Sequence, residues 1–176
     1  MLCGLLLAGA AHAFNGVDIT GQGYGGDFRL LGHDGKPRTA ADFTGKLMVI
    51  NFGFTHCPDV CPTTLAVLAS AIGSLGDEAG KVQVLFVTID PKRDTPQVLA
   101  KYVTAFDPRF LGLSGDAAAT RRVARSFHVF YQKAGAGFDH SAGSYVIDGQ
   151  GRTRLFLRQT LSGEDIAYDI QQLLRE

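Results

Sequence analysis

An almost unbroken apolar run, from Leu47 to Phe54, places the strongest constraint on how this chain can fold. The run has the length of one strand and contains β-branched residues, which predicts a central strand covered on both faces. A helix is predicted soon afterwards, from Pro62 to about Leu75, because apolar residues recur there at spacings of three and four. Proline suits the first position of such a helix. The chain is therefore expected to pass directly from a central strand into a helix.

The elements on either side of this unit complete the pattern of an α/β domain. Turn residues at 32–36 separate two short strands and predict a hairpin, and Gly149 to Gly151 predicts another near the end of the chain. Strands and helices alternate between them. This order predicts a thioredoxin-like α/β sandwich with a central mixed sheet and an added N-terminal hairpin. The other expected elements are strands at 28–31, 38–40, 82–89, 110–113, 129–132, 144–148 and 153–157, and helices at 94–106, at 116–127 and from 162.

Three segments are expected along the chain. Residues 1–13 are apolar and end in small residues, which is typical of a signal peptide or, with more apolar residues upstream, of the end of a membrane anchor. No Lys or Arg precedes Arg29, so the basic region of a signal peptide is missing and we expect the natural start to lie upstream. Residues 14–26 are glycine-rich and predict a flexible lead-in, and 27–176 form the thioredoxin-like domain. We therefore expect an exported, periplasmic protein, either free or anchored to the inner membrane.

Charge points to no particular partner. Lys plus Arg equals Asp plus Glu, at 17 each, and no basic run occurs. Nucleic acid and anionic membrane surfaces are therefore not expected as partners. The length of 176 residues suits one hydrophobic core, and we expect a monomer.

Two cysteines remain once the N-terminal segment is set aside, and both lie between the central strand and the helix. Cys57 and Cys61 are four residues apart, so on a helical turn their Cβ atoms are about 5 to 6 Å apart on one face. Their sulfurs can hold one ion or, after a modest adjustment, form a disulfide. The start of a helix favours thiolate over thiol, which assists metal binding and thiol exchange equally. The pair alone leaves a metal site, a redox dithiol and a stabilising disulfide open.

A third candidate ligand lies far along the chain. His140 belongs to a predicted loop, 135–143, which faces the cysteine turn in a thioredoxin-like sheet. Thioredoxins have a cis-proline in this loop, whereas this chain has none and offers an imidazole nitrogen. Two thiolates and one imidazole make a soft site that suits Cu(I), can hold Cu(II) and also fits zinc. His56 is not expected to join them, because neighbouring residues on an extended backbone point to opposite sides.

Three acidic residues near these candidates have more than one interpretation. Asp139 either orients the imidazole of His140 through a hydrogen bond or caps a turn. Asp59 is expected to be an ordinary turn residue between the cysteines, with a supporting role toward the metal as the alternative. Asp94 is expected to belong to the turn and cap that begin the next helix.

Three ordered motifs carry a family resemblance, within a region from about Val17 to the carboxyl terminus. They are FGFTHCPDVCPTTL at 52–65, VTIDPKRDTPQVLAKY at 87–102 and DHSAGSYVID at 139–148. These motifs resemble the Sco/SenC family of copper-binding assembly factors for cytochrome c oxidase. The resemblance implies that one copper ion is bound by Cys57, Cys61 and His140.

The resemblance also implies a function and a partner. The first interpretation is a copper metallochaperone that delivers copper to the CuA centre in subunit II of cytochrome c oxidase, and on this interpretation the protein is not an enzyme. The first alternative is a thiol–disulfide reductase of that centre's cysteines, with Cys57 and Cys61 as its redox-active pair. A copper or redox sensor is the second. Another periplasmic copper chaperone or thiol–disulfide protein is a further expected partner.

Overall fold

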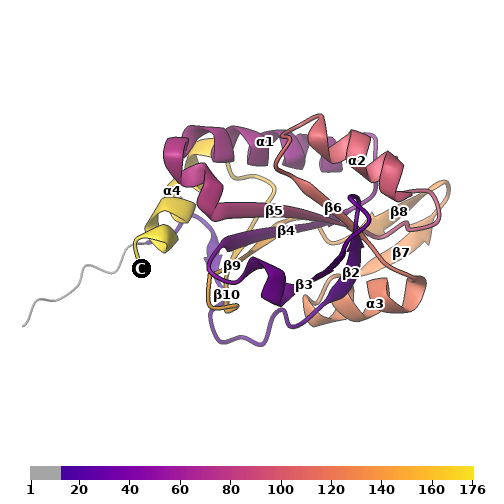
Figure 1. Ribbon diagram of the computed structural model, residues 1–176, viewed down its shortest axis with the longest axis horizontal. Helices are drawn as coiled ribbons and strands as arrows, with labels where there is room; N and C mark the ends of the chain where they lie inside the picture. The colour runs from indigo at the N-terminus through magenta and orange to yellow at the C-terminus, as the bar shows by residue number, and fades with distance from the viewer. Residues whose placement is uncertain (1–12) are drawn as a thin grey trace, which may run out of the picture.

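The computed structural model describes residues 13–176 and contains an eight-stranded sheet with the order β1-β10-β9-β4-β5-β6-β2-β3 (Figure 1). Strand β4, Leu47–Gly53, runs parallel to β5, Val82–Thr88, and antiparallel to β9, Ser144–Ile147. The predicted central strand and mixed sheet are confirmed. The remaining strands of this sheet are β1 Val17–Asp18, β2 Arg29–Gly32, β3 Pro37–Thr39, β6 Leu111–Ser114 and β10 Thr153–Leu157.

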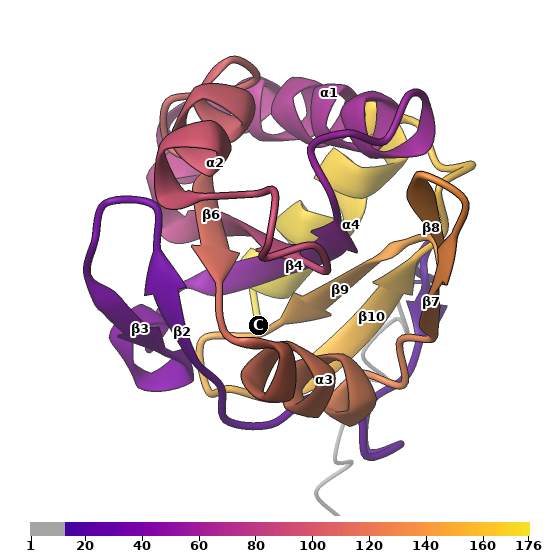
Figure 2. The same cartoon turned by 90° about the vertical axis from the view of Figure 1, so that its right-hand side faces the viewer.

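Helices cover both faces of the sheet. Helices α1, Val60–Ser74, and α2, Pro96–Thr104, lie on one face, and α3, Ala117–Ser126, lies on the other (Figures 1 and 2). The last helix, α4, Gly163–Leu174, packs against α1. This arrangement is the predicted thioredoxin-like sandwich. Two 3-10 helices, Ala40–Phe43 and Gly76–Lys81, complete the connections before β4 and β5.

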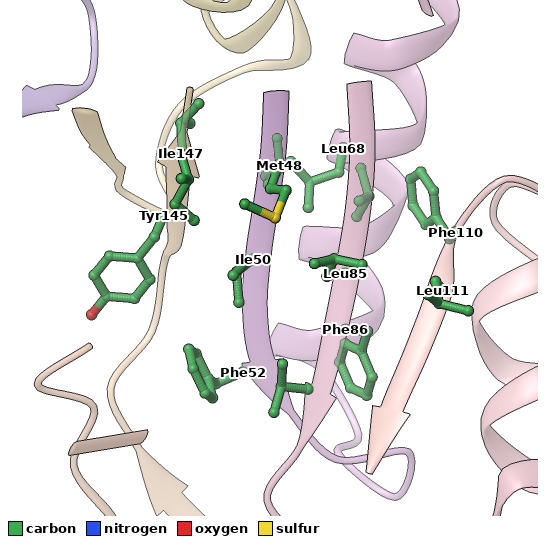
Figure 3. Close-up of a cluster of buried hydrophobic side chains, with 14 of the residues drawn as sticks. Met48, Ile50, Phe52, Leu68, Leu85, Phe86, Phe110, Leu111, Tyr145 and Ile147 are labelled. Carbon is green, nitrogen blue, oxygen red and sulfur yellow. The ribbon is translucent and has the colours of Figure 1, made fainter. Parts of the chain in front are cut away.

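The hydrophobic core is centred on β4. Every residue of this strand is buried, as its apolar run predicts. Figure 3 shows Ile50 and Phe52 of β4 beside Leu85 and Phe86 of the parallel neighbour β5. Because both faces of β4 are covered, the strand gives a rigid base to the loop that follows it.

The N-terminal hairpin is present and extends the main sheet, because β2 pairs with both β3 and β6. The segment 14–26 differs from the flexible lead-in that its composition predicts. Strand β1 pairs with β10, and the backbone N–H groups of Asn15 and Gly16 donate to the carboxylate of Asp169 at 2.9 and 2.7 Å. Asp169 is completely buried, so these donors help to satisfy the hydrogen-bonding needs of its side-chain oxygens.

The loop predicted at 135–143 contains a strand instead. Residues 135–143 include strand β8, Gly137–His140, which pairs antiparallel with β7, Tyr131–Ala134, in a separate two-stranded hairpin. The register sets His140 directly opposite Tyr131. Strand β8 has only four residues, of which Phe138 alone is a large apolar residue, so it lacks the apolar alternation that identifies a strand.

The described residues, 13–176, include no helix that is long and apolar enough to cross a membrane. The predicted signal or anchor segment, residues 1–13, lies outside the described residues except for Ala13.

Candidate metal centre

The two cysteines lie where β4 ends and α1 begins. Helix α1 starts at Val60, so Pro62 is not at its first position as predicted, and Cys61 belongs to the first turn. A proline is tolerated there because backbone N–H groups of that turn have no intrahelical acceptor. Cys61 is only 2% exposed, and its sulfur lies against Gly53, where a Cβ atom would come within 2.7 Å of it. Glycine at the end of β4 therefore makes room for the second thiol.

The first thiol is half-buried, in surroundings that favour its thiolate. Partial burial tends to raise the pKa of Cys57. Hydrogen bonds from the backbone N–H groups of Asp59, Cys61 and Val60 outweigh this effect, so the pKa lies below its ordinary value. These donors belong to the start of α1, where a negative charge is stabilised.

The second thiol has the opposite character. Burial raises the pKa of Cys61 to about 12, and a hydrogen bond with the backbone of Phe54 offsets this only in part. Negative charge on Cys57 and Asp94 raises it further. Cys61 is therefore protonated at neutral pH in the metal-free protein, and a metal ion must displace that proton when it binds.

His140 reaches the cysteines from the end of β8. Its Nδ1 lies 2.9 Å from the carbonyl oxygen of Ser141, and its Nε2 lies 3.8 Å from Sγ of Cys61. A carbonyl oxygen can only accept a hydrogen bond, so Nδ1 carries the proton and Nε2 presents its lone pair to the thiols. The ring also packs nearly at right angles to Phe54, with centroids 6.0 Å apart.

Strand β4 also holds the segment that follows His140. The side-chain amide of Asn51, a buried polar residue in this apolar strand, donates to the carbonyl of Gly143 and to Oγ of Ser144, both at 3.1 Å. These bonds connect the strand that leads to the cysteines with the segment that carries the histidine. Asn51 therefore helps to set the distance between the two halves of the site.

The structure brings the three predicted ligands together. One donor atom from each of Cys57, Cys61 and His140 lies within 4.8 Å of the others. Ligands bound at about 2.0 to 2.3 Å to one ion are roughly 3.5 to 4 Å apart, so a small inward movement would complete a three-coordinate site. Two sulfurs and one nitrogen are soft donors, which suit Cu(I) and can also hold Cu(II) or zinc.

The cap and first-turn proline predicted at 94–96 are present at the start of α2, but Asp94 does not provide the cap. The side chain of Thr95 caps this helix instead. The Asp94 carboxylate is completely buried and accepts hydrogen bonds from the backbone N–H and Oγ1 of Thr55, at 3.0 and 2.6 Å. It also accepts one from Oγ1 of Thr88, at 2.5 Å. Asp94 therefore fastens the loop that precedes Cys57 to β5 and to the start of α2.

The side chains of the other candidates do not belong to the group of three ligands. Asp139 is exposed on β8, and because side chains alternate along a strand it points away from the face that carries His140. The carbonyl of Ser141 orients the imidazole instead. Asp59 is exposed at the N-cap of α1 and forms no side-chain cap bond, so its backbone N–H is its contribution to the site. His56 is exposed and does not belong to the group of three.

Tyr102 of α2 lies near the site and gave no functional signal in the sequence, because tyrosine is ordinary on the apolar face of a helix. Burial raises its pKa well above the usual range, and the charges of Cys61, Cys57 and Asp94 raise it further. Its hydroxyl is buried and has no hydrogen-bond partner within the described part of the chain. Its ring packs against that of Phe86 in β5, with centroids 5.6 Å apart.

Fold and site together define a class of protein. A thioredoxin-like sandwich with two cysteines at the first helix and a histidine on a neighbouring hairpin is a domain that can hold a soft metal ion or exchange disulfides. The family model described as SCO1/SenC matches residues 17–175. The chain therefore belongs to the SCO1/SenC family.

Individual relatives agree with this assignment. The chain is 39% identical over 155 residues to "Protein SCO2 homolog, mitochondrial" of Bos taurus, a match that covers 84% of this chain and 58% of that protein. It is 38% identical over 135 residues to a SCO2-like protein of Rickettsia felis, covering 73% of this chain and 66% of the relative. The chain thus spans 58% and 66% of the length of these two relatives.

Solved structures show the same fold. The copper-bound structure of Bradyrhizobium japonicum ScoI has a TM-score of 0.80 and 37% identity, and covers 85% of this chain and 99% of that one. The apo Sco1 structure from Thermus thermophilus has a TM-score of 0.82 and 39% identity, and covers 94% and 99% of the two chains.

Proposed function

We propose that this chain binds one copper ion through Cys57, Cys61 and His140 and acts as a metallochaperone for the CuA centre of cytochrome c oxidase. The observation that carries the proposal is the convergence of these side chains, since Cys61 and His140 are 79 residues apart in sequence. Structures of two relatives, 37% and 35% identical, are described with copper bound, which supports copper over zinc. The choice of subunit II as the protein that receives the copper is based on the family resemblance.

The mechanism that the site supports is ligand exchange. Cys57 and His140 are half-buried and open to an incoming protein, whereas Cys61 is buried. A thiolate of the target displaces one of the accessible ligands first. Cys61 leaves last and recovers the proton that it lost when the metal bound. Copper keeps its oxidation state in this sequence, so the transfer needs no reductant.

Copper binding requires reduced cysteines. Both thiols are free in the structure. A disulfide between Cys57 and Cys61 would remove two of the three ligands, so oxidation should release the metal. Retention of stoichiometric copper after complete disulfide formation would contradict this ligand set.

A second candidate function rests on the contrast between the two thiols. An accessible Cys57 with a lowered pKa and a buried Cys61 with a raised pKa resemble an attacking and a resolving cysteine. The Cys57 thiolate attacks a target disulfide and releases one target thiolate. Cys61 then loses its proton and displaces the second target thiolate. The target gains two electrons from the dithiol and two protons, one released by Cys61 and one taken from water, and the protein ends as a disulfide that another dithiol protein must reduce.

One variant separates the two functions. Copper-loaded wild-type protein should metallate the reduced CuA domain of subunit II, whereas His140→Ala should fail and the matched control His56→Ala should succeed. If His140→Ala instead reduces the oxidised domain at the wild-type rate and no copper moves in any sample, the reductase function replaces the chaperone function.

The proposal places the protein in the periplasm. Its support is the apolar segment 1–13, which has the pattern of an export signal or the end of an anchor. Copper or electrons would then come from another periplasmic copper chaperone or thiol–disulfide protein. Fractionation of cells that express the full-length gene tests this location, and recovery of the protein in the cytoplasm would contradict it.

A further inference from the structure

A groove of about 400 Å³ lies between α3 and the β7–β8 hairpin, which are neighbours in both Figure 1 and Figure 2. Arg121 and Arg125 of α3 line one side. The other side is lined by Phe130, the residue before β7, and by Lys133 and Phe138 of the hairpin. The groove does not include the metal ligands, but the same hairpin ends in one of them.

The charges around this groove have a single sign. Arg121, Arg125 and Lys133 are exposed, none forms an ion pair within residues 13–176, and no acidic residue lines the groove. Arg121 and Arg125 are also one helical turn apart, where like charges repel. Burial raises the pKa of Tyr131 in the groove, and these two arginines partly oppose that rise. An anionic partner would relieve the repulsion and interact favourably with all three cations.

An exposed aromatic side chain stands beside these charges. Phe130 is 58% exposed, the largest fraction among the large hydrophobic residues of the described chain. Aromatic side chains and arginines are enriched where proteins bind other proteins. Three basic residues line the groove, a smaller basic face than a lipid or nucleic-acid surface calls for. The groove is therefore suited to an acidic protein segment.

Hydrogen bonds connect the groove to the histidine ligand. The N–H of Ser141 donates to the carbonyl of Phe130 at 2.9 Å, and its Oγ accepts the N–H of Phe130 at 3.1 Å. The carbonyl of the same Ser141 accepts a hydrogen bond from Nδ1 of His140. A protein bound at Phe130 would therefore contact a residue that is hydrogen-bonded to Ser141, whose carbonyl orients the imidazole of His140.

We infer that the groove bounded by Arg121, Arg125, Phe130 and Lys133 is the docking site for the protein that receives the metal. An acidic segment of that protein pairs with the three cations, and an apolar side chain of it covers Phe130. The identity of the partner as a metal recipient rests on the proposed function. The docking itself requires no metal, so the two can be tested separately.

The first test uses the reduced, metal-free chain and a peptide of six glutamates and one leucine. Backbone amide NMR shifts should centre on α3 and the hairpin, and should weaken with salt. The double variant Arg121→Glu/Arg125→Glu should bind the peptide roughly tenfold more weakly. The matched control Lys101→Glu/Arg158→Glu makes the same charge change at exposed positions outside the groove and should bind like wild type. Equal weakening in both double variants, or shifts centred elsewhere, would overturn the inference.

A second readout separates docking from copper binding. The arginine double variant should keep the copper affinity of wild type and transfer copper to the CuA domain roughly tenfold more slowly. An unchanged transfer rate would overturn the inference, as would a preference of the groove for phosphatidylglycerol vesicles over the peptide. If the arginine double variant does not fold, Lys133→Glu on the exposed hairpin replaces it. This variant should also keep the copper affinity of wild type and transfer copper more slowly. If wild type binds no copper, the proposed function fails, while the peptide result still decides the docking.

Discussion

His140 can act as a ligand because the carbonyl of Ser141 keeps the proton on its far nitrogen. The three candidate ligands could be predicted from the sequence, since thiols at helical spacing and a distant imidazole carry recognisable chemistry. The groups that support them could not. Ser141 acts through its backbone, and Asp94 acts through contacts with Thr55, 39 residues away, so no local pattern reveals either role. Asp139 was a candidate only as a sequence neighbour of the histidine.

Asp94→Asn tests the support of the cysteine loop. An amide offers one acceptor oxygen where the carboxylate serves three donors, so one donor is left unpaired and we expect a loss of about 2 kcal/mol in the free energy of unfolding. Copper affinity should fall with it, because the loop before Cys57 loosens. Asp107→Asn is the matched control, since this buried carboxylate pairs with Arg109 outside the site. Urea unfolding and competition with a copper chelator measure the two effects, and equal copper affinities in the two variants would contradict the assigned role.

The opposite pKa shifts of the two thiols predict an order of alkylation. A lowered pKa means that the Cys57 thiolate persists to lower pH, so Cys57 should react with iodoacetamide below the pH of about 8.5 at which an ordinary thiol is half ionised. Cys61 should stay protonated, and so unreactive, until the pH approaches about 12. Mass spectrometry of the reduced, metal-free protein across a pH series measures both sites. Modification of Cys61 first, or of both cysteines together, would show that the assignment is wrong.

Among the secondary-structure elements, most strands of the main sheet were predictable, whereas β1 and β8 were not. Strand β4 carries a nearly unbroken apolar run, and every residue of it is buried. Strands β1 and β8 are short and lie in glycine-rich segments, so their pairing depends on partners elsewhere in the fold. Because β8 was not predicted, His140 was expected in a loop, whereas the structure places it at the end of a strand paired with β7.

Two glycine variants test how closely β4 packs against α1. Gly53→Ala places a Cβ atom 2.7 Å from Sγ of Cys61 and 2.9 Å from the ring of Phe86, and should destabilise the fold by about 1 to 3 kcal/mol. Gly73→Ala, within α1, meets nothing within 4 Å and should stabilise it by about 0.5 to 1 kcal/mol. Urea unfolding gives both values. A neutral Gly53→Ala would mean that the thiol has room to move.

The main sheet brings the two halves of the candidate site together. The cysteines follow the central strand and the histidine precedes the neighbouring strand β9, so correct pairing of β4 with β9 is a condition for metal binding. The order of strands and helices was sufficient to predict this fold class. The basic groove could not be predicted in the same way, because a balanced total charge conceals a local cluster of cations.

Copper stoichiometry of the reduced chain tests the proposed copper site. After equilibration with a competing chelator, wild type should retain one copper per chain, while Cys57→Ser, Cys61→Ser and His140→Ala should lose it and His56→Ala should keep it. Far-UV circular dichroism confirms that each variant is folded. Stoichiometric copper in folded His140→Ala, or none in wild type, would contradict a copper site built from two thiols and this imidazole.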